Sequence, residues 1–319
     1  MQTEYDIIII GGGPAGMTAG IYATRAGAKV LMIEKNGVGG QVALTSTIAN
    51  YPGCKDIDGF ILSQNMFEQV TALGVETLFA EVDNVILDKK IKQVIANGVT
   101  YTAPAIILSM GAYSRGLGIE SEKKFIGKGV SYCAVCDGAF FRGKTVAVVG
   151  GGNTALQDAI YLSPIVKKVY LVHRREGFRA DDVVVSDLEN LCKTANIEKC
   201  LNKVVIDLQG ENKLEKMVLR DVQTMEEKSI DVDGVFVAIG RNPNVELLNG
   251  AVELSNGYIK VNAQMETNIA GVYACGDIID KSLRQIATAI ADGAIAGTNA
   301  SSFAKKINKN STKNNKKIS

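Results

Sequence analysis

Two cysteines three positions apart are the residues of this chain best suited to chemistry. Cys133 and Cys136 are followed directly by Asp137. A pair at this spacing can close a small, readily reduced disulfide whose thiolate is stabilised by its partner or by a helix N-terminus. The adjacent carboxyl can supply or accept the proton that thiol chemistry needs, and it can also cap a following helix. We predict a redox-active pair with Asp137 as its general acid or base.

Two other interpretations of the pair remain. A structural zinc site needs about four ligands, usually from two close pairs, but Cys192 and Cys200 are poorly spaced and the chain has one histidine, His173. We therefore expect no metal site. Both cysteines of the pair could instead be unconnected core residues, as we expect for Cys54, Cys192, Cys200 and Cys275. With one histidine and no catalytic serine motif, hydrolytic triads are excluded.

A strand, a glycine turn, a helix and a second strand occur twice along the chain. The first copy spans residues 6–10, 11–16, 17–26 and 29–33, and the second spans 144–149, 150–155, 156–163 and 168–172. A lone G-x-G-x-x-G motif is weak evidence for a nucleotide site. Here both copies follow a buried strand pattern and open a helix, where backbone N–H groups can approach a pyrophosphate. The pattern predicts an α/β fold with parallel sheets and two Rossmann-like nucleotide-binding domains.

The residue at the end of each second strand distinguishes the two nucleotide sites. An acidic residue that binds the adenosine ribose is expected about 20 residues past the glycines, and Glu34 fills that place in the first copy. The same count from Gly150 reaches His173, followed by Arg174, Arg175 and, nearby, Arg179. Guanidinium groups bind a 2′-phosphate that a carboxylate would repel. The first site should therefore take an adenine dinucleotide with a free ribose, and the second NADPH.

The last elements of the chain belong with the first copy. We expect strands at 257–261 and 271–277 and a helix at 282–300. These elements cannot complete the second copy without an implausibly large sheet. The second domain is then inserted into the first. We expect a first domain of residues 1–115 and 244–305, an inserted domain of 116–243, and a disordered basic tail of 306–319, where lysines alternate with Asn, Ser and Thr.

The composition of the chain limits where the protein can be located and which partners it can bind. A net charge of +1 gives no reason to expect nucleic acid or an anionic membrane as a partner. Residues 7–24 lack charge, but Gly11-Gly12-Gly13-Pro14 would break a membrane helix, and the acidic start is unlike a secretory signal. We expect a cytoplasmic protein without membrane contact.

Several motifs, in their order and spacing, resemble the low-molecular-weight bacterial thioredoxin reductases along nearly the whole chain. They are 11–16, Gly39-Gly40-Gln41, 133–138, 150–155, His173-Arg174-Arg175, 177–180, 237–240, Gly276-Asp277 and Arg284-Gln285. The resemblance implies two three-layer β/β/α domains, FAD in the first and NADPH in the inserted one, thioredoxin as substrate and a homodimer. It also implies that Cys136 faces the flavin, that Cys133 attacks thioredoxin, and that the inserted domain rotates.

These arguments and the resemblance together give the expected cofactor ligands. Those for FAD are Gly11, Gly13, Pro14, Ala15, Gly16, Glu34, Lys35, Gly39, Gly40, Gln41, Asn50, Val82, Gly276, Asp277, Arg284, Gln285 and Ile286. Those for NADPH are Gly150, Gly152, Asn153, Thr154, Ala155, His173, Arg174, Arg175, Arg179, Ile239 and Gly240.

Two departures and three alternatives accompany the resemblance. Ser109-Met110-Gly111 stands where the family shows Ala-Thr-Gly, and Cys275 replaces a small residue beside Gly276. A reductase of a peroxiredoxin system would need a thioredoxin-like region that we expect on a separate chain, since the glycine strand starts at Asp6. A non-enzymatic redox sensor has no support beyond the tail, and a ferredoxin-driven reductase would lack the arginines.

Overall fold

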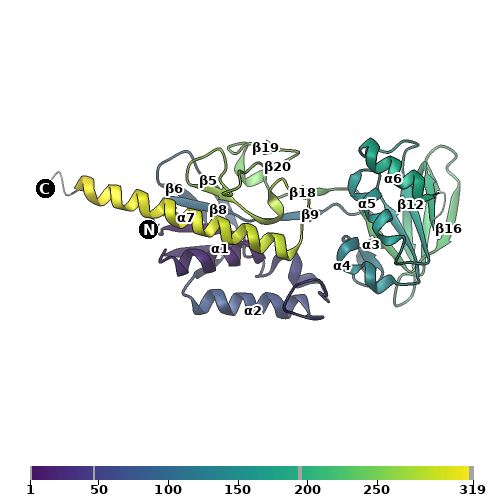
Figure 1. Ribbon diagram of the computed structural model, residues 1–319, viewed down its shortest axis with the longest axis horizontal. Coiled ribbons are helices and arrows are strands. Elements are labelled where there is room, and N and C mark those ends of the chain that lie inside the picture. Colours follow the sequence, from purple (N-terminus) through teal and green to yellow (C-terminus); the bar gives the residue numbers. More distant parts are fainter. Residues whose placement is uncertain (1, 46, 193–195, 316–319) are drawn as a thin grey trace. The chain divides into compact units, whose positions relative to one another are not determined.

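Two compact units make up the chain, whose residues 2–45, 47–192 and 196–315 are described by a computed structural model (Figure 1). The discontinuous unit comprises Met1–Tyr113 and Pro243–Ser319, and the inserted unit comprises Ser114–Asn242. The chain passes between them in β9 (Ala112–Ser114) and β18 (Arg241–Pro243), which pair with each other. The expected boundaries lie within two residues of these crossings.

A parallel sheet forms the centre of the discontinuous unit. Its order is β21-β8-β2-β3-β4, and its strands are Val272–Ala274, Ala105–Leu108, Ile7–Ile10, Val30–Glu34 and Glu76–Phe79. A second sheet, mostly antiparallel, has the order β1-β7-β6-β5, with strands Gln2–Glu4, Val99–Ala103, Lys92–Ala96 and Val82–Ile86. The helices are α1 (Pro14–Arg25), α2 (Gly59–Ala72) and α7 (Ile286–Asn315).

Alternation along β2 explains why this unit has three layers. Successive side chains of a strand point to opposite faces. Ile7 and Ile9 therefore pack in a cluster with alanines of α1 and α7, whereas Ile8 and Ile10 pack with Val94 of β6. The parallel sheet thus lies between helices and the second sheet, which is the predicted β/β/α arrangement.

Small residues bring α1 and α7 into close contact, and the two helices run side by side (Figure 1). A Cβ atom at Gly293 or Gly297 of α7 would overlap the backbone oxygens of Ala15 and Ala19 in α1. Pro14 occupies the first turn of α1, where its missing N–H costs nothing. The helix that opens at the first glycine turn is therefore fixed against the end of the chain.

Helix α7 extends beyond its expected end. It continues to Asn315, so residues 306–315 are helical where composition predicted a disordered tail. Extending a helix is far less costly than starting one, and this helix is already packed through Ala300 and Ala304. Asn308 Nδ2 also donates to Asp6 Oδ1 at 2.6 Å. Residues 316–319 of the expected tail lie outside the described residues.

The inserted unit repeats the design. Its parallel sheet has the order β10-β17-β11-β12-β13, with strands Val130–Ser131, Gly234–Val237, Thr145–Val149, Lys168–His173 and Ile197–Leu201. An antiparallel sheet, β14-β15-β16, has strands Lys203–Gln209, Lys216–Asp221 and Glu227–Asp231. The helices are α3 (Glu122–Phe125), α4 (Ala134–Asp137), α5 (Asn153–Leu162) and α6 (Asp182–Cys192). Val146 and Val148 pack on α5, whereas Ala147 and Val149 face the second sheet.

The remaining elements are short. They are β19 (Leu254–Ser255), β20 (Tyr258–Ile259) and four 3-10 helices, η1 (Gly40–Leu44), η2 (Gly138–Phe141), η3 (Glu246–Leu248) and η4 (Gly276–Ile278). Within residues 2–45, 47–192 and 196–315, none of the helices combines the length and apolar character needed to span a membrane.

Candidate functional site

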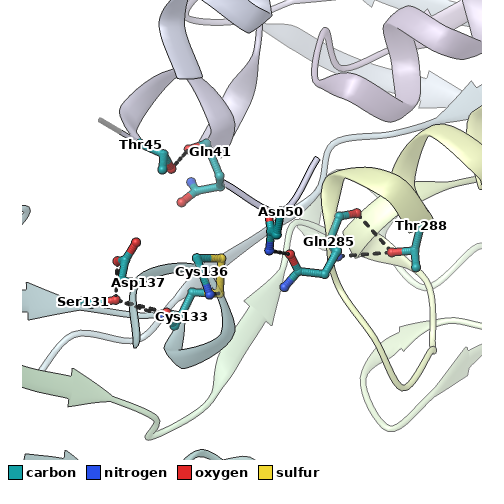
Figure 2. The surroundings of a disulfide bond; sticks show 9 residues. All are labelled: Gln41, Thr45, Asn50, Ser131, Cys133, Cys136, Asp137, Gln285 and Thr288. Carbon is teal, nitrogen blue, oxygen red and sulfur yellow. Dashed lines mark hydrogen bonds between the residues drawn. A yellow bond between two sulfur atoms is a disulfide. The ribbon is translucent and has the colours of Figure 1, made fainter. Parts of the chain in front are cut away.

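Cys133 and Cys136 are joined by a disulfide at the start of α4 in the inserted unit (Figure 2). Cys133 has extended backbone angles at the N-cap position, and its Sγ accepts a hydrogen bond from the N–H of Cys136 at 3.2 Å. Donation to a sulfur stabilises negative charge on it. The predicted pair is closed, and the sulfur of Cys133 receives a backbone donor.

Asp137 lies at the end of the same short helix. Its Oδ2 accepts a hydrogen bond from the Ser131 hydroxyl at 2.6 Å (Figure 2). Burial raises the pKa of the Asp137 carboxyl, and the Ser131 hydrogen bond opposes that rise. The side chain makes no capping hydrogen bond to η2, so the alternative capping role is not observed. A half-buried carboxyl with a raised pKa is suited to carry a proton beside a disulfide.

The first glycine turn, residues 11–16, connects β2 to α1 in the discontinuous unit. Gly12 N donates to Glu34 Oε2 at 2.6 Å, so the expected ribose ligand lies directly beside the turn. Gly11 has a φ of 108°, and a Cβ there would overlap the backbone at Ser109. By contrast, nothing lies within 4 Å of a Cβ built on Gly13. The turn thus leaves open space at the position where a dinucleotide approaches the backbone.

Other predicted FAD ligands contact this turn or one another. Gly39 N donates to Gly12 O at 2.8 Å, which ties the Gly39-Gly40-Gln41 segment to it. Asn50 Nδ2 donates to Gln285 Oε1 at 3.1 Å (Figure 2), and Ile286 begins α7 directly afterwards. Lys35 forms an exposed ion pair with Glu81 at 2.6 Å, and Val82 follows Glu81 as the first residue of β5.

Arg284 and Asp277 lie in a connected loop. The Arg284 guanidinium donates to the carbonyls of Asp277, Ile279 and Lys281 and lies 4.0 Å from the Tyr258 ring centroid. It therefore organises the loop that carries Gly276 and Asp277. Sequence reasoning expected a direct cofactor ligand here and had no signal for this backbone role.

Both departures from the family pattern are accounted for. The Ser109 hydroxyl lies 2.9 Å from Ile10 O and 3.0 Å from Gly11 O, so it adds a hydrogen bond at the glycine turn. Cys275 is fully buried, and burial raises the pKa of its thiol. A thiol that stays protonated in a core is unreactive, which argues against a redox role for Cys275.

The second glycine turn connects β11 to α5 in the inserted unit. A Cβ at Gly151 would overlap the His173 ring, whereas a Cβ at Gly152 would meet nothing within 4 Å. Asn153 and Asp181 exchange hydrogen bonds at 2.7 and 2.9 Å, and Arg179 N donates to Gly151 O at 2.7 Å. The arginine segment is therefore fastened to the turn. Thr154 and Ala155 lie in the first turn of α5, and a Cβ at Gly150 would overlap the carbonyl of Ala238, which directly precedes Ile239 and Gly240.

His173 differs in role from the arginines that follow it. Its ring is buried, with its centroid 5.6 Å from that of Phe178 in a stacked arrangement. Burial lowers the pKa of the imidazole, a hydrogen bond with the backbone of Gly177 opposes this, and the charges of Arg179, Arg174 and Arg175 lower it further. The imidazole is therefore neutral, whereas the three guanidinium groups are exposed. His173 Nε2 is buried without a hydrogen-bond partner within the described part of the chain.

Three residues that were not among the predicted ligands or catalytic residues belong to the site. Ser131 holds Asp137, Phe178 supports the His173 ring, and Asp181 anchors the arginine segment. A hydroxyl two residues before the first cysteine was the available signal for Ser131. Phe178 lies within the 177–180 motif, whereas Asp181 had no signal beyond its nearness to Arg179.

Comparison with known proteins was made on the whole chain. A model of the family described as pyridine nucleotide-disulphide oxidoreductase matches residues 5–293. The chain is 42% identical over 305 residues to the thioredoxin reductase of Bacillus subtilis (strain 168), covering 95% of this chain and 96% of that protein. It is 39% identical over 305 residues to the thioredoxin reductase of Escherichia coli O157:H7, covering 93% and 95%. The solved thioredoxin reductase from Streptococcus pyogenes MGAS5005 matches with a TM-score of 0.89 and 37% identity, covering 95% of this chain and 99% of that one.

Proposed function

The chain belongs to the pyridine nucleotide-disulphide oxidoreductase family, and we propose that it is an NADPH-dependent thioredoxin-disulfide reductase that uses FAD. The observation that carries this proposal is a closed Cys133–Cys136 disulfide in the same unit as a glycine turn flanked by exposed arginines. A reducible disulfide and a site suited to a phosphorylated nucleotide are the two parts that such a reductase needs.

FAD would bind at the first glycine turn. Gly13 leaves room for a pyrophosphate, Glu34 is placed beside the turn for a ribose, and the loop at Asp277 is held rigid by Arg284. When bound, FAD supplies a group that accepts a hydride from NADPH and reduces a disulfide with the same two electrons. The residues of this unit fit that group because they leave open backbone where it must approach.

NADPH would bind at the second glycine turn. The open position at Gly152 is the counterpart of Gly13, and Arg174, Arg175 and Arg179 would contact the 2′-phosphate. His173 lies at the same edge, where its neutral ring packs against Phe178 and Gly151. Selectivity for NADPH over NADH then rests on the three guanidinium groups, and the histidine contributes no charge.

The cysteines and Asp137 complete the transfer to the substrate. The Cys133 thiolate attacks a sulfur of the thioredoxin disulfide and displaces one thioredoxin thiolate. Cys136 then attacks Cys133 Sγ, which restores the disulfide and displaces the second thiolate. Two electrons and two protons enter thioredoxin, whereas NADPH brings a hydride, so one further proton is needed. Asp137 is placed to deliver it.

An apolar surface beside the disulfide suits a protein substrate. Val135 is 41% exposed and Phe140 is 47% exposed, and they flank Asp137 along the chain. Exposed apolar side chains next to reactive groups are typical of protein-binding surfaces. We propose that thioredoxin contacts both.

Location and assembly complete the proposal. A cytoplasmic location accords with a disulfide that must cycle between oxidised and reduced forms. We also propose a homodimer, as the resemblance implies, with exposed apolar side chains of α2 such as Phe60 and Ile61 available to a second copy. The inserted unit would rotate about its two connecting strands to present the disulfide and the nicotinamide in turn.

The test is steady-state oxidation of NADPH with oxidised thioredoxin as acceptor, repeated with NADH. The proposal predicts stoichiometric formation of thioredoxin thiols and a strong preference for NADPH. Equal rates with both nucleotides, or NADPH oxidation without thiol formation, would contradict it.

A further inference from the structure

Ser131 is buried at the end of β10, two residues before the disulfide, and its hydroxyl makes three short polar contacts. The oxygen accepts from Cys133 N at 3.1 Å, lies 2.6 Å from Asp137 Oδ2 and lies 3.4 Å from Cys133 O (Figure 2). One side chain thus joins the backbone of the first cysteine to the carboxyl that serves it.

From this geometry we propose that Ser131 is a positioning residue that holds Asp137 beside the disulfide in both of its protonation states. The inference rests on the proposed disulfide reductase function. Ser131 itself needs no contact with substrate or cofactor, because it acts through the carboxyl of Asp137.

The hydroxyl can serve both states because it is both a donor and an acceptor. When Asp137 is ionised, the single hydroxyl hydrogen points to Oδ2, which is nearer than Cys133 O. When Asp137 is protonated, the carboxyl donates to the same oxygen, and the serine hydrogen can turn to Cys133 O. The Cys133 N–H remains bonded throughout. The carboxyl therefore keeps its place while it gains and loses its proton.

Other groups packed around α4 do not replace this contact. The helix packs against α5, which carries Asp158 and Tyr161, and Tyr161 lies against Gly138. Arg142 follows η2. Among the described residues, only burial and the Ser131 hydrogen bond act on the pKa of Asp137. Removal of the hydroxyl should therefore have a specific and visible effect on this carboxyl.

The test compares Ser131→Ala and Ser131→Thr in the full-length holoenzyme. Ser163→Ala is the matched control, because Ser163 is also a buried serine of the inserted unit, bonded to Ile160 O. Aspartate labelled with ¹³C at its carboxyl reports the titration of Asp137 by NMR, with Asp137→Asn giving the assignment. Thioredoxin reduction is followed against pH in parallel.

Ser131→Ala should move the titration of Asp137 to higher pH, because the donor that favours the ionised form is lost. It should also lower the rate of thioredoxin reduction about tenfold. Ser131→Thr should restore both quantities, and Ser163→Ala should change neither. An unchanged Asp137 titration in Ser131→Ala, or a loss of rate that threonine does not rescue, would overturn the inference. If Ser131→Ala shifts the titration of Asp137 but the wild-type enzyme reduces no thioredoxin, the proposed function is refuted and the positioning role of Ser131 is not.

Discussion

Alanine at Gly151 should destabilise the fold, whereas alanine at Gly152 should weaken NADPH binding and leave the fold intact, although the two glycines are neighbours in one turn. A Cβ at Gly151 would overlap the His173 ring, which is buried and stacked on Phe178 and therefore has little room to move. Overpacking of this kind costs about 1–3 kcal/mol. We expect Gly151→Ala to lower the thermal midpoint by at least about 4 °C, the change that each kcal/mol produces in a unit of this size.

Gly152→Ala should instead leave the fold intact. Gly152 has φ −104° and ψ 179°, which alanine adopts freely, and its Cβ would point into open space. Replacing glycine with alanine at such a position stabilises the folded protein by about 0.4–1 kcal/mol, because alanine has fewer conformations in the unfolded chain. The same space is where the pyrophosphate of NADPH would approach the backbone. NADPH affinity should therefore fall at least about tenfold, roughly 1.4 kcal/mol.

Thermal unfolding of the ligand-free proteins and calorimetric titration with NADPH measure the two effects separately. Wild-type NADPH affinity in Gly152→Ala would refute the placement of the pyrophosphate at this turn. Undiminished stability in Gly151→Ala would refute the packing of His173 against it.

Three further changes test other parts of the account. Gly13→Ala should reduce the FAD content of the purified protein without lowering the stability of the ligand-free form, since its Cβ meets nothing within 4 Å; equal flavin content in variant and wild type would contradict the site. Replacing Arg174 and Arg175 with Gln should raise KM for NADPH about 10- to 100-fold and leave KM for NADH nearly unchanged; equal effects would exclude the 2′-phosphate assignment. Burial raises the pKa of Asp158 from 3.8 to about 7, and the charge of Arg241 opposes the rise. Between these two pH values the folded protein keeps a proton that the unfolded chain has lost, so the free energy of unfolding falls as the pH rises from about 4 to about 7. Asp158→Asn should therefore stabilise the protein more at pH 8 than at pH 5, by up to about 3 kcal/mol, the cost of ionising the buried carboxyl that builds up between pH 5 and 7, and a gain in thermal midpoint that is the same at both pH values would contradict this.

The sequence was sufficient for the elements with strong local signals. An apolar run followed by glycines and a helical pattern predicted β2 with α1 and β11 with α5, because burial on both faces of a parallel strand requires continuous apolar residues. The antiparallel strands are harder to recognise. Residues of β5, for example, are mostly half-buried or exposed, so they show no continuous apolar signal.

The residues of the site were predictable where their position along the chain fixes their position in the fold. Counting from the glycines placed Glu34 and His173 at equivalent strand ends, but no count reveals that the His173 ring turns inward to a neutral, buried position. The backbone role of Arg284 and the bridge made by Ser131 depend on loop geometry that composition and spacing do not encode. Packing likewise decided the end of α7, since it extended a helix that local composition disfavoured.

The most direct measurement is NADPH oxidation coupled to thioredoxin reduction in Cys136→Ser, with Cys192→Ser as the control. Cys192 is a half-buried cysteine of the same unit that forms no disulfide. The account predicts one NADPH oxidised per thioredoxin disulfide in the wild type and in Cys192→Ser, and no thioredoxin reduction in Cys136→Ser. A wild-type rate of thioredoxin reduction in Cys136→Ser would contradict the central claim that electrons pass through the Cys133–Cys136 pair.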